Sequence, residues 1–496
     1  MAAMKDQTLR PTRYDFCNLQ FAICNLQFAI ASLGTLLLLS TAYSGEPWTT
    51  YRGNTQRTAN TDKTAGPANP KVLWVHKSQD HYVAALVPDG DKLFLSGLGA
   101  FNVSTFYELS TDPKAAQRSV WTKTTPYLKL PTVSSPALMD GKLIFGDGMH
   151  QTDGATLHCI TVDKGLPLWQ LRVPGDLVHL EGSPTIAGGM VYLGGGAAGV
   201  LCVDPSHVTL DGKEMDLKSI QKVLDEKWAA LLKKYEEDKK KDPDFAVPPN
   251  EDQLPKPSPK LAWQQGEKKW HVDAPVTVVG DKVLVASAFL DKEKVGDRAL
   301  FCLDAKSGEV KWRAPLKLNP WGGPSVIGDT IIVSGSTIGY DTKALKEAKG
   351  DLIAINLADG KEKWRKEITT GGVIGCAALV DDVAVVTATD GKVRAFKLAD
   401  GEREWIYDAK TPLFAPAAVA GGVVYAGDLK GVIHAIDLAS GEKKWTLDLG
   451  TDPDVKAPGM IYGGPIVNGG RIYAATCNIE GTFAQKPTVV VCIGEK

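Results

Sequence analysis

The side chains of this sequence that could do chemistry stand in short segments that precede a proline or small-residue turn. Two of these segments place a histidine and a carboxylate two residues apart: HLEGSP holds His179 and Glu181, and HVDAP holds His271 and Asp273. Successive side chains alternate between the two faces of a strand, so each pair shares one face. That spacing can be used for metal binding or acid–base catalysis, and surface ion pairing is the alternative interpretation.

Three further segments carry aromatic side chains that could stack a flat ligand or simply fill a channel: NPWGGP with Trp321, LFAP with Phe414 and MIYGGP with Tyr462. No Ser/His/Asp order or phosphate-binding loop stands out. We therefore predict a ligand-binding set at a channel mouth, without a catalytic residue and without a metal site. Its members are His179, Glu181, His271, Asp273, Trp321, Phe414 and Tyr462.

Each of these segments leads into a repeated pattern of short apolar runs. The runs pair as hairpins in SPTIAGGMVYLGGG (183–196), APVTVVGDKVLVAS (274–287), GPSVIGDTIIVSG (323–335) and APAAVAGGVVYAGD (415–428). Gly-Gly, Gly-Asp or Asp-Gly between two alternating runs is typical of a tight β-turn. A third run follows, then an Asx-Gly or Ser-Gly turn, then a run that carries tryptophan. Four strands in a repeat of about 40 residues indicate a propeller blade.

Eight tryptophans occupy the expected fourth-strand position, which predicts an all-β, eight-bladed β-propeller of four-stranded antiparallel blades. We expect a structural girdle in which each indole packs on the neighbouring blade, formed by Trp74, Trp121, Trp169, Trp270, Trp312, Trp364, Trp405 and Trp445. The segment 70–77 is a tryptophan strand with no blade before it, and the C-terminal end supplies three strands without one. Joining the two ends would complete the eighth blade and close residues 70–496 into a ring.

The stretch 204–262 breaks the β pattern within the predicted third blade. Residues 215–241 place apolar side chains at three- and four-residue spacing, which predicts an amphipathic helix, and a proline-rich arm follows it. One interpretation is a helix that packs its apolar face on the propeller rim. The other is that residues 212–260 form a docking element for a protein partner.

Composition and the N-terminus limit the classes of function. The chain has 496 residues, 23% of them charged, and a formal net charge of −2, which gives no electrostatic footprint for nucleic acid. Basic residues followed by an apolar run predict a signal peptide over 1–44, which contains a tandem duplication of CNLQFAI, and an N-terminal extension over 45–69. We expect a periplasmic or extracellular protein without a transmembrane domain in its mature chain. An uncleaved anchor over 19–42 is the alternative.

Four cysteines of the predicted mature chain stand where other repeats have alanine: Cys159, Cys202, Cys302 and Cys492. Exchange with alanine indicates a small buried side chain, so free thiols are expected.

The four C-terminal repeat units resemble the tryptophan-docking repeat of the PQQ-like, or quinoprotein-alcohol-dehydrogenase-like, β-propeller superfamily. These units are CLDAKSGEVKW (302–312), AINLADGKEKW (354–364), AFKLADGEREW (395–405) and AIDLASGEKKW (435–445). The resemblance extends over residues 70–496 apart from the insertion. The resemblance implies the fold. It does not imply one function, because the superfamily includes quinoprotein dehydrogenases, the propeller lipoprotein of outer-membrane β-barrel assembly and sensor domains.

The motifs that would decide between these functions are missing from the sequence. Quinoprotein dehydrogenases typically hold pyrroloquinoline quinone with an adjacent pair of cysteines and bind Ca²⁺ through Glu, Asn and Asp. This chain has no adjacent cysteines and no alignable calcium set, so we predict no cofactor and carry over no catalytic residue. The barrel-assembly propeller starts from a lipobox, which is also absent. We expect an exported, monomeric, non-catalytic propeller that binds or scaffolds protein partners or a small ligand. The alternative is a quinone-dependent dehydrogenase with a divergent site.

Overall fold

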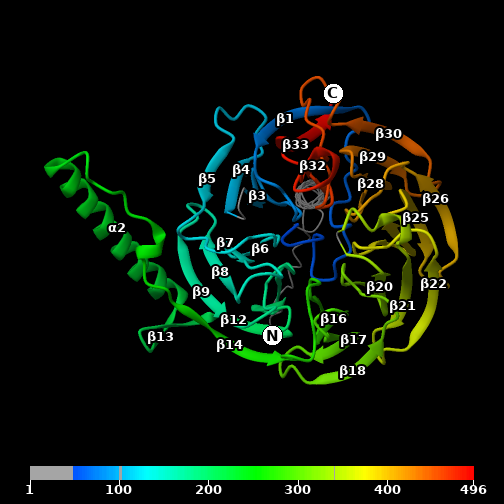
Figure 1. The fold of residues 1–496 in the computed structure, drawn as a ribbon, viewed down its shortest axis with the longest axis horizontal. Helices are drawn as coiled ribbons and strands as arrows, with labels where there is room; N and C mark the ends of the chain where they lie inside the picture. Colours follow the sequence, from blue (N-terminus) through cyan, green and yellow to red (C-terminus); the bar gives the residue numbers. More distant parts are fainter. Residues whose placement is uncertain (1–47, 100–102, 340) are drawn as a thin grey trace, which may run out of the picture. The chain divides into compact units, whose positions relative to one another are not determined.

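The computed structural model describes residues 48–99, 103–339 and 341–496, and within them the strands form eight antiparallel sheets arranged in a ring (Figure 1). Seven sheets have four strands and the third has five. This confirms the predicted eight-bladed propeller. The predicted signal peptide, residues 1–44, lies outside the described residues.

The strands follow one another blade by blade. The first blade contains β2 (Val87–Asp89), β3 (Lys92–Leu98), β4 (Ser104–Ser110) and β5 (Ser119–Lys123), and the second contains β6 (Ala137–Met139), β7 (Lys142–Gly146), β8 (Ala155–Thr161) and β9 (Pro167–Val173). The third contains β10 (Thr185–Ala187), β11 (Met190–Gly194), β12 (Val200–Leu210), β13 (Lys213–Asp216) and β14 (Ser258–Gln265). The fourth contains β15 (Thr277–Val279), β16 (Lys282–Leu290), β17 (Val295–Asp304) and β18 (Val310–Pro315). The next three contain β19 (Pro324–Ile327), β20 (Thr330–Ser336), β21 (Gly350–Asn356) and β22 (Glu362–Ile368); β23 (Ala378–Val380), β24 (Val383–Thr387), β25 (Lys392–Lys397) and β26 (Arg403–Asp408); and β27 (Ala418–Ala420), β28 (Val423–Gly427), β29 (Val432–Asp437) and β30 (Lys443–Asp448). The eighth contains β31 (Ile466–Asn468), β32 (Arg471–Ala475), β33 (Thr488–Glu495) and β1 (Pro70–Ser78). Within the residues that the structure describes, the helices are α2 (Leu217–Lys241) and the short 3₁₀ turns η2 (Glu251–Gln253), η3 (Leu345–Glu347) and η4 (Gly481–Phe483).

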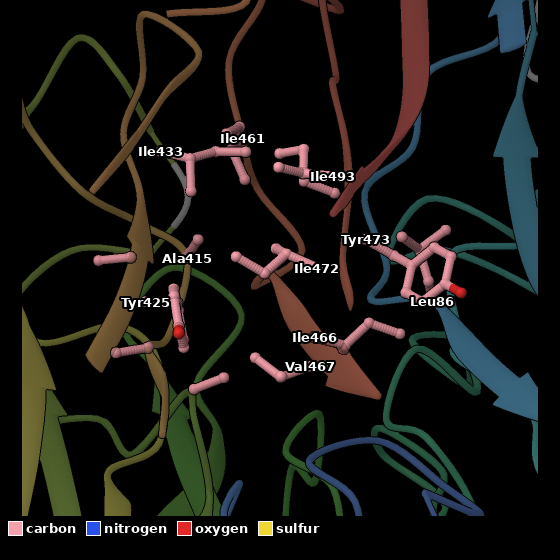
Figure 2. Packing of buried hydrophobic residues seen from close by; sticks show 14 of the residues in the cluster. Leu86, Ala415, Tyr425, Ile433, Ile461, Ile466, Val467, Ile472, Tyr473 and Ile493 are labelled. Carbon is pink, nitrogen blue, oxygen red and sulfur yellow. The ribbon is translucent and has the colours of Figure 1, made fainter. Parts of the chain in front are cut away.

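The eighth blade joins the two ends of the propeller. Strand β1 pairs antiparallel with β33 from Pro70 opposite Glu495 to Ser78 opposite Thr488. The closure predicted from the sequence is therefore confirmed, and β33 has hydrogen-bonded neighbours on both of its sides. Buried apolar side chains of the first, seventh and eighth blades pack together at this junction, among them Leu86, Tyr425, Ile433, Ile472 and Ile493 (Figure 2). Pairing and packing thus hold the ring shut without a separate closing element.

A small side chain stands opposite the fourth-strand tryptophan in seven blades. The register pairs are Trp74 with Cys492, Trp169 with Cys159, Trp263 with Cys202, Trp312 with Cys302, Trp364 with Ala354, Trp405 with Ala395 and Trp445 with Ala435. In the first blade Glu108 takes this position, opposite Trp121. The six described cysteines are free and buried, as expected for small filling side chains.

The register corrects one member of the predicted girdle. Trp263, in β14, is the residue opposite Cys202, whereas Trp270 lies in the connection between the third and fourth blades and stacks on Phe301 with ring centres 4.0 Å apart. The sequence QQGEKKW imitates the repeat phrase ASGEKKW. The chain returns from the insertion as β14, which ends at Gln265 within this phrase. Trp270, the tryptophan of the phrase, therefore lies beyond the last strand of the blade.

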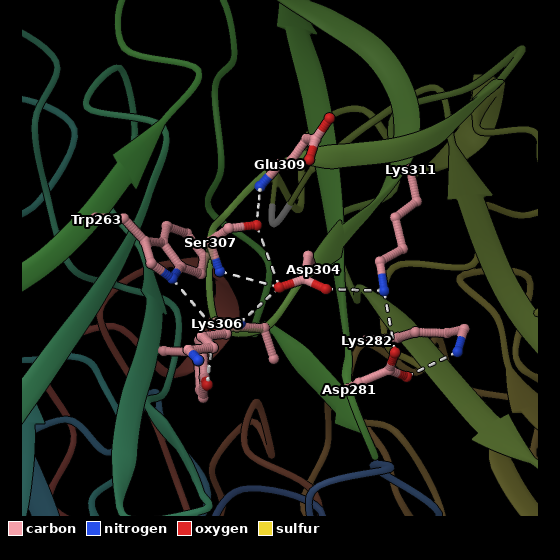
Figure 3. Close-up of polar contacts among 10 residues, drawn as sticks. Trp263, Asp281, Lys282, Asp304, Lys306, Ser307, Glu309 and Lys311 are labelled. Atoms are coloured by element: carbon pink, nitrogen blue, oxygen red, sulfur yellow. Dashed lines mark hydrogen bonds and ion pairs between the residues drawn. The ribbon is translucent and has the colours of Figure 1, made fainter.

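Seven of the tryptophans donate an indole hydrogen bond to a backbone carbonyl oxygen of the next blade or, for Trp445, of the N-terminal extension. The distances are 2.8–3.3 Å, from Trp74 to Thr111, Trp121 to Val162, Trp263 to Ala305, Trp312 to Leu357, Trp364 to Leu398, Trp405 to Leu438 and Trp445 to Pro67. Figure 3 shows the contact of Trp263 with the turn that contains Asp304 and Ser307. The phrase repeated in the sequence therefore links one blade to the next.

The glycine of each phrase lies against the incoming indole. Gly308 has a φ of +73°, and a Cβ atom built there would lie 2.7 Å from the ring of Trp263. Gly360 and Gly401 have the same relation to the preceding blade's tryptophan. Only glycine combines this backbone conformation with so close an approach of an indole.

Most of the insertion forms a projecting arm, whereas its two ends pair with β12 as β13 and the start of β14 and so belong to the third blade. Asp216 caps α2, since its side chain accepts a hydrogen bond from the backbone N–H of Ser219. Ile220 and Leu224 are buried against the second and third blades, while the rest of α2 lies outside the ring (Figure 1). The chain returns through residues 242–257, where Glu251 forms an ion pair with Lys123 of β5. Across the described residues, the helices are too short or too polar to traverse a membrane.

The N-terminal extension fills the centre of the propeller, which the sequence did not predict. Figure 1 shows this segment in dark blue inside the ring. We refer to residues 48–59 as the plug. The backbone N–H groups of Leu138, Val278, Val326, Leu379 and Val419, all on innermost strands, donate to the carbonyl oxygens of Thr49, Thr55, Gln56, Thr58 and Ala59. The plug therefore satisfies inward-facing backbone groups of five blades.

Arg57 anchors the plug to the blades around it. Its guanidinium is buried and donates to the carbonyl oxygens of Ser183 and Val276 at 3.2 Å, and also to the Thr185 hydroxyl and the Tyr51 carbonyl. Burial lowers the pKa of Arg57 to about 10, so the side chain keeps its charge at neutral pH. From the plug, the chain runs past Pro67 into β1.

Candidate functional site

A cavity of about 330 Å³ opens at one mouth of the channel, where the segments that precede the innermost strands meet. Residues before β2, β6, β10, β15, β19 and β31 line it, and Tyr51 of the plug lines it as well. This is the mouth at which the sequence placed the candidate ligand residues.

The structure brings most of the predicted set together. Five of the seven side chains line the cavity: His179, Glu181, Asp273, Trp321 and Tyr462. His271 lies directly behind them, fully buried, with its Nε2 atom 2.9 Å from Asp273 Oδ1. Phe414 is buried outside the cavity lining and packs edge-on against Tyr462, with ring centres 5.4 Å apart. Its position is that of a packing residue behind the cavity wall.

His179 is held at the junction of the second and third blades. The backbone N–H of Leu180 donates to Asp147, and that of Ala197 donates to Leu177, so both flanks of His179 are fixed. Gly196, with a φ of +57°, makes room for the ring, because a Cβ atom there would lie 2.8 Å from His179 Nε2. His179 Nδ1 is 3.6 Å from Glu181 Oε1.

His271 and Asp273 enter the site from the connection to the fourth blade. The backbone N–H of His271 donates to Ser287 Oγ at 3.0 Å, and its carbonyl oxygen accepts from Ala288. Asp273 Oδ1 lies between two imidazoles, 2.9 Å from His271 Nε2 and 3.4 Å from His179 Nε2. One carboxylate oxygen therefore faces both rings.

His150, which the sequence analysis did not select, completes the cluster. It lies in the connection between β7 and β8 and lines the same cavity. Its backbone N–H donates to Glu181 Oε1 at 3.0 Å, and its Nε2 is 3.8 Å from Glu293 Oε1. Strand-start segments alone could not reveal it. The sequence feature that could have identified His150 is its place in the connection between β7 and β8, which reaches the same mouth of the channel.

The electrostatics of the cluster follow from burial. Burial lowers the pKa of His179 to about 4, so the ring is neutral at pH 7 and keeps a nitrogen lone pair. Burial also raises the pKa of Glu181 to about 7, and the Asp273 carboxylate adds to this shift. For Asp273, burial would raise the pKa, but His179 and His271 outweigh it and lower the pKa. The site thus combines neutral imidazole with an ionised carboxylate.

The fit of a quinone cofactor can be tested on these residues. Ca²⁺ takes six to eight oxygen ligands, whereas the two carboxylates that line the cavity, Glu181 and Asp273, lie against imidazoles. Below the mouth, the plug occupies the channel. The residues present do not fit pyrroloquinoline quinone with calcium.

Comparison with known proteins shows similarity to propellers with PQQ-like repeats over part of the chain. The family model described as outer membrane protein assembly factor BamB matches residues 254–347 and 322–489. The outer membrane protein assembly factor BamB of Burkholderia pseudomallei (strain K96243) is 32% identical over 152 residues, which is 30% of this chain and 33% of that protein. The match thus spans about a third of that relative's length.

Solved structures share the fold at low sequence identity. The crystal structure of BamB from Moraxella catarrhalis has a TM-score of 0.54 and 13% identity, covering 85% of this chain and 97% of that chain. The quinohemoprotein alcohol dehydrogenase from Comamonas testosteroni has a TM-score of 0.59 and 13% identity, covering 92% of this chain and 82% of that chain. An assembly factor and a dehydrogenase share this architecture, so the fold alone does not choose between them.

Proposed function

We propose that this chain, an eight-bladed propeller of the PQQ-like repeat superfamily, is an exported module that binds or scaffolds a protein partner and has no catalytic activity of its own. The observation that carries the proposal is the plug. Residues 48–59 of the chain itself occupy the centre of the channel and are anchored by Arg57, which supports a function without a cofactor buried there. The match to relatives named as assembly factors supports the same conclusion.

The projecting arm supplies a surface for a partner. Phe245 and Val247, just beyond α2, are 82% and 79% exposed, and a groove between them and the end of the helix includes Leu231 and Tyr235. Exposed apolar groups of this size are typical of interaction sites. Helix α2 carries eight lysines against five carboxylates. We therefore expect a protein partner with an apolar pocket and an acidic rim. Its surface would contact the arm, residues 212–260.

The dehydrogenase alternative makes a different prediction for the purified protein. Incubation with pyrroloquinoline quinone and Ca²⁺ should give no saturable absorbance change and no alcohol-dependent dye reduction. Dye reduction that saturates with the quinone would contradict the proposal.

Export and oligomeric state belong to the same proposal. A signal peptide over 1–44 predicts a mature N-terminus near residue 45, and N-terminal sequencing of the secreted or periplasmic protein would test this. An uncleaved N-terminus recovered with the membrane fraction would support the anchor alternative instead. Light scattering should give the mass of a monomer.

The partner itself can be trapped through the arm. A photo-cross-linking amino acid at Phe245 should give one discrete protein adduct in the producing cell. The same amino acid at Ile406, an exposed position on β26 of the sixth blade, is the matched control and should not. Equal adducts at both positions, or none at Phe245, would contradict docking through the arm.

A further inference from the structure

The three imidazoles at the channel mouth form a nearly equilateral triangle. Ring centres are 5.3 Å apart for His179 and His271, and 5.6 Å apart from each of these to His150. Three imidazoles bound to one zinc ion through bonds of about 2.0–2.1 Å have ring centres roughly 5 to 5.5 Å apart. One nitrogen of each ring can be chosen so that all three lie within 4.8 Å of one another. The triangle therefore has the dimensions of a metal site.

The two buried rings lack hydrogen-bond partners. His179 is 1% exposed and His271 is 0% exposed, and none of their four ring nitrogens makes a hydrogen bond of good geometry, although His271 Nε2 lies 2.9 Å from Asp273 Oδ1. A buried polar atom without a partner is costly, so native structures rarely leave one. A ligand bound between the two adjacent rings would satisfy one nitrogen of each.

Other buried histidines of the described residues show what a purely structural histidine looks like in this propeller. His158 contacts Asp147 through Nε2 at 2.7 Å, and its Nδ1 lies 3.2 Å from Gln170. His434 lies between Asp428 and Tyr407, at 3.2 and 3.0 Å. Both nitrogens of each ring are satisfied, which is the arrangement that His179 and His271 lack.

Asp273 supplies an oxygen at the spacing of a fourth ligand. Its Oδ1 atom is 2.9 and 3.4 Å from the Nε2 atoms of His271 and His179, yet it makes no hydrogen bond. Ligand atoms of a tetrahedral zinc ion with bonds of about 2.0–2.1 Å lie roughly 3.3–3.4 Å apart. Close approach without hydrogen-bond geometry is expected when several atoms face one ion rather than each other.

We propose that His150, His179, His271 and Asp273 bind one divalent transition-metal ion of the Zn²⁺ class at the channel mouth. Three imidazole nitrogens and one carboxylate oxygen suit Zn²⁺ or a similar ion and do not suit Ca²⁺ or Mg²⁺, which require oxygen ligands. His150 is the most exposed of the three histidines, with a side chain that is 38% exposed, and its backbone N–H is held by Glu181.

The neighbouring carboxylate of Glu181 lies against two of the proposed ligands. Glu181 faces His179 Nδ1 at 3.6 Å and accepts the backbone N–H of His150 at 3.0 Å, so it links the two ligand-bearing loops. Carboxylates in this position commonly fix the ring orientation of metal-binding histidines. The cavity on the other side gives the ion an exposed face. This proposal does not depend on the role of the arm.

The test is metal binding by the full-length, tag-free protein after treatment with a chelator and buffer exchange. Titration with Co²⁺ should give one equivalent of bound ion with the intense visible absorption of a four-coordinate site, and Zn²⁺ should displace it. His150→Gln alters a partly exposed loop side chain, so the fold should survive, and it should weaken Co²⁺ binding at least tenfold. Asp273→Asn should also weaken it.

His207→Gln is the control, because His207 is an exposed histidine of the insertion and pairs with Asp204. It should bind Co²⁺ as the unchanged protein does, and circular dichroism should be the same for all variants. Binding of no cobalt, binding with only octahedral absorption, or equal affinity in His150→Gln would overturn the proposal.

Discussion

The indole nitrogen of Trp263 lies 3.1 Å from the carbonyl oxygen of Ala305 in the next blade and donates a hydrogen bond to it. The two residues are 42 positions apart, and the contact joins the blade that contains the insertion to the blade that follows it. Equivalent contacts recur around the ring, so this bond is one unit of the interaction that holds the propeller together.

Replacing Trp263 separates the hydrogen bond from the packing. Trp263→Phe keeps an aromatic ring but loses the bond, and should lower the free energy of unfolding by about 1 kcal/mol. Trp263→Ala removes the ring as well and should cost about 2–4 kcal/mol, since the indole is partly exposed. Urea unfolding followed by circular dichroism measures both values. Equal costs for the two variants would mean that packing contributes nothing beyond the bond.

The glycine beneath this indole offers a matched pair of substitutions. Gly308→Ala would place a methyl group 2.7 Å from the Trp263 ring, whereas Gly280→Ala, also at positive φ, meets no atom within 4 Å. Both substitutions strain the backbone, so only the first also displaces the indole. We expect Gly308→Ala to lower the urea midpoint clearly more than Gly280→Ala. Equal midpoints would show that the close contact is unimportant.

The plug contains two buried arginines with different surroundings. Arg57 has several carbonyl acceptors, while Nε and Nη2 of Arg52 have no hydrogen-bond partner. Arg57→Met leaves these acceptors unsatisfied and should cost more than about 3 kcal/mol of unfolding free energy. Arg52→Met removes a poorly compensated buried charge and should cost less than about 1 kcal/mol. Urea unfolding of the two variants measures both losses of unfolding free energy. A larger loss for Arg52→Met than for Arg57→Met would refute this description of the plug.

The turn that accepts Trp263 should make stability depend on acid pH. A hydrogen bond from Lys311 and those from the amides of Ser307 and Lys306 lower the pKa of Asp304 in the folded state. A carboxyl group whose pKa is lower in the folded state stabilises the protein at pH values above its unfolded-state pKa of about 3.9. This contribution is lost as the pH falls through the folded-state pKa. Asp304→Asn should therefore be less stable than the unchanged protein at neutral pH. The difference should shrink below about pH 4. Urea midpoints measured across this range test it, and a gap that stays constant or widens in acid would contradict it.

Much of the fold could be predicted because the repeat is local. The Gly-containing turns, the alternating runs and the Trp phrase each lie within about 40 residues, and they were enough for eight blades and the closing strand. Trp270 was assigned wrongly because its phrase matches the repeat, whereas the correct Trp263 is defined by pairing across the insertion with Cys202. Cross-strand register over so long an interruption cannot be read from one sequence.

The site was predicted only in part for a similar reason. Its strand-start members, such as His179 and Asp273, share a recurrent sequence position, and so they were found. His150 comes from a different strand connection and has no repeated neighbour. The plug was not predicted because its carbonyl oxygens accept hydrogen bonds from five blades that are distant in sequence, and its local sequence pattern does not indicate these contacts.

The propeller is proposed to act by binding a protein through its arm. The affinity of the purified chain for the partner trapped at Phe245 tests this role of the arm. The double variant Phe245→Asp and Val247→Asp should weaken this affinity at least tenfold, because charge would enter the apolar contact. Ile406→Asp, a matched change on the outer strand β26, should leave it unchanged. Unaltered affinity in the double variant, or an equal loss in Ile406→Asp, would contradict the account.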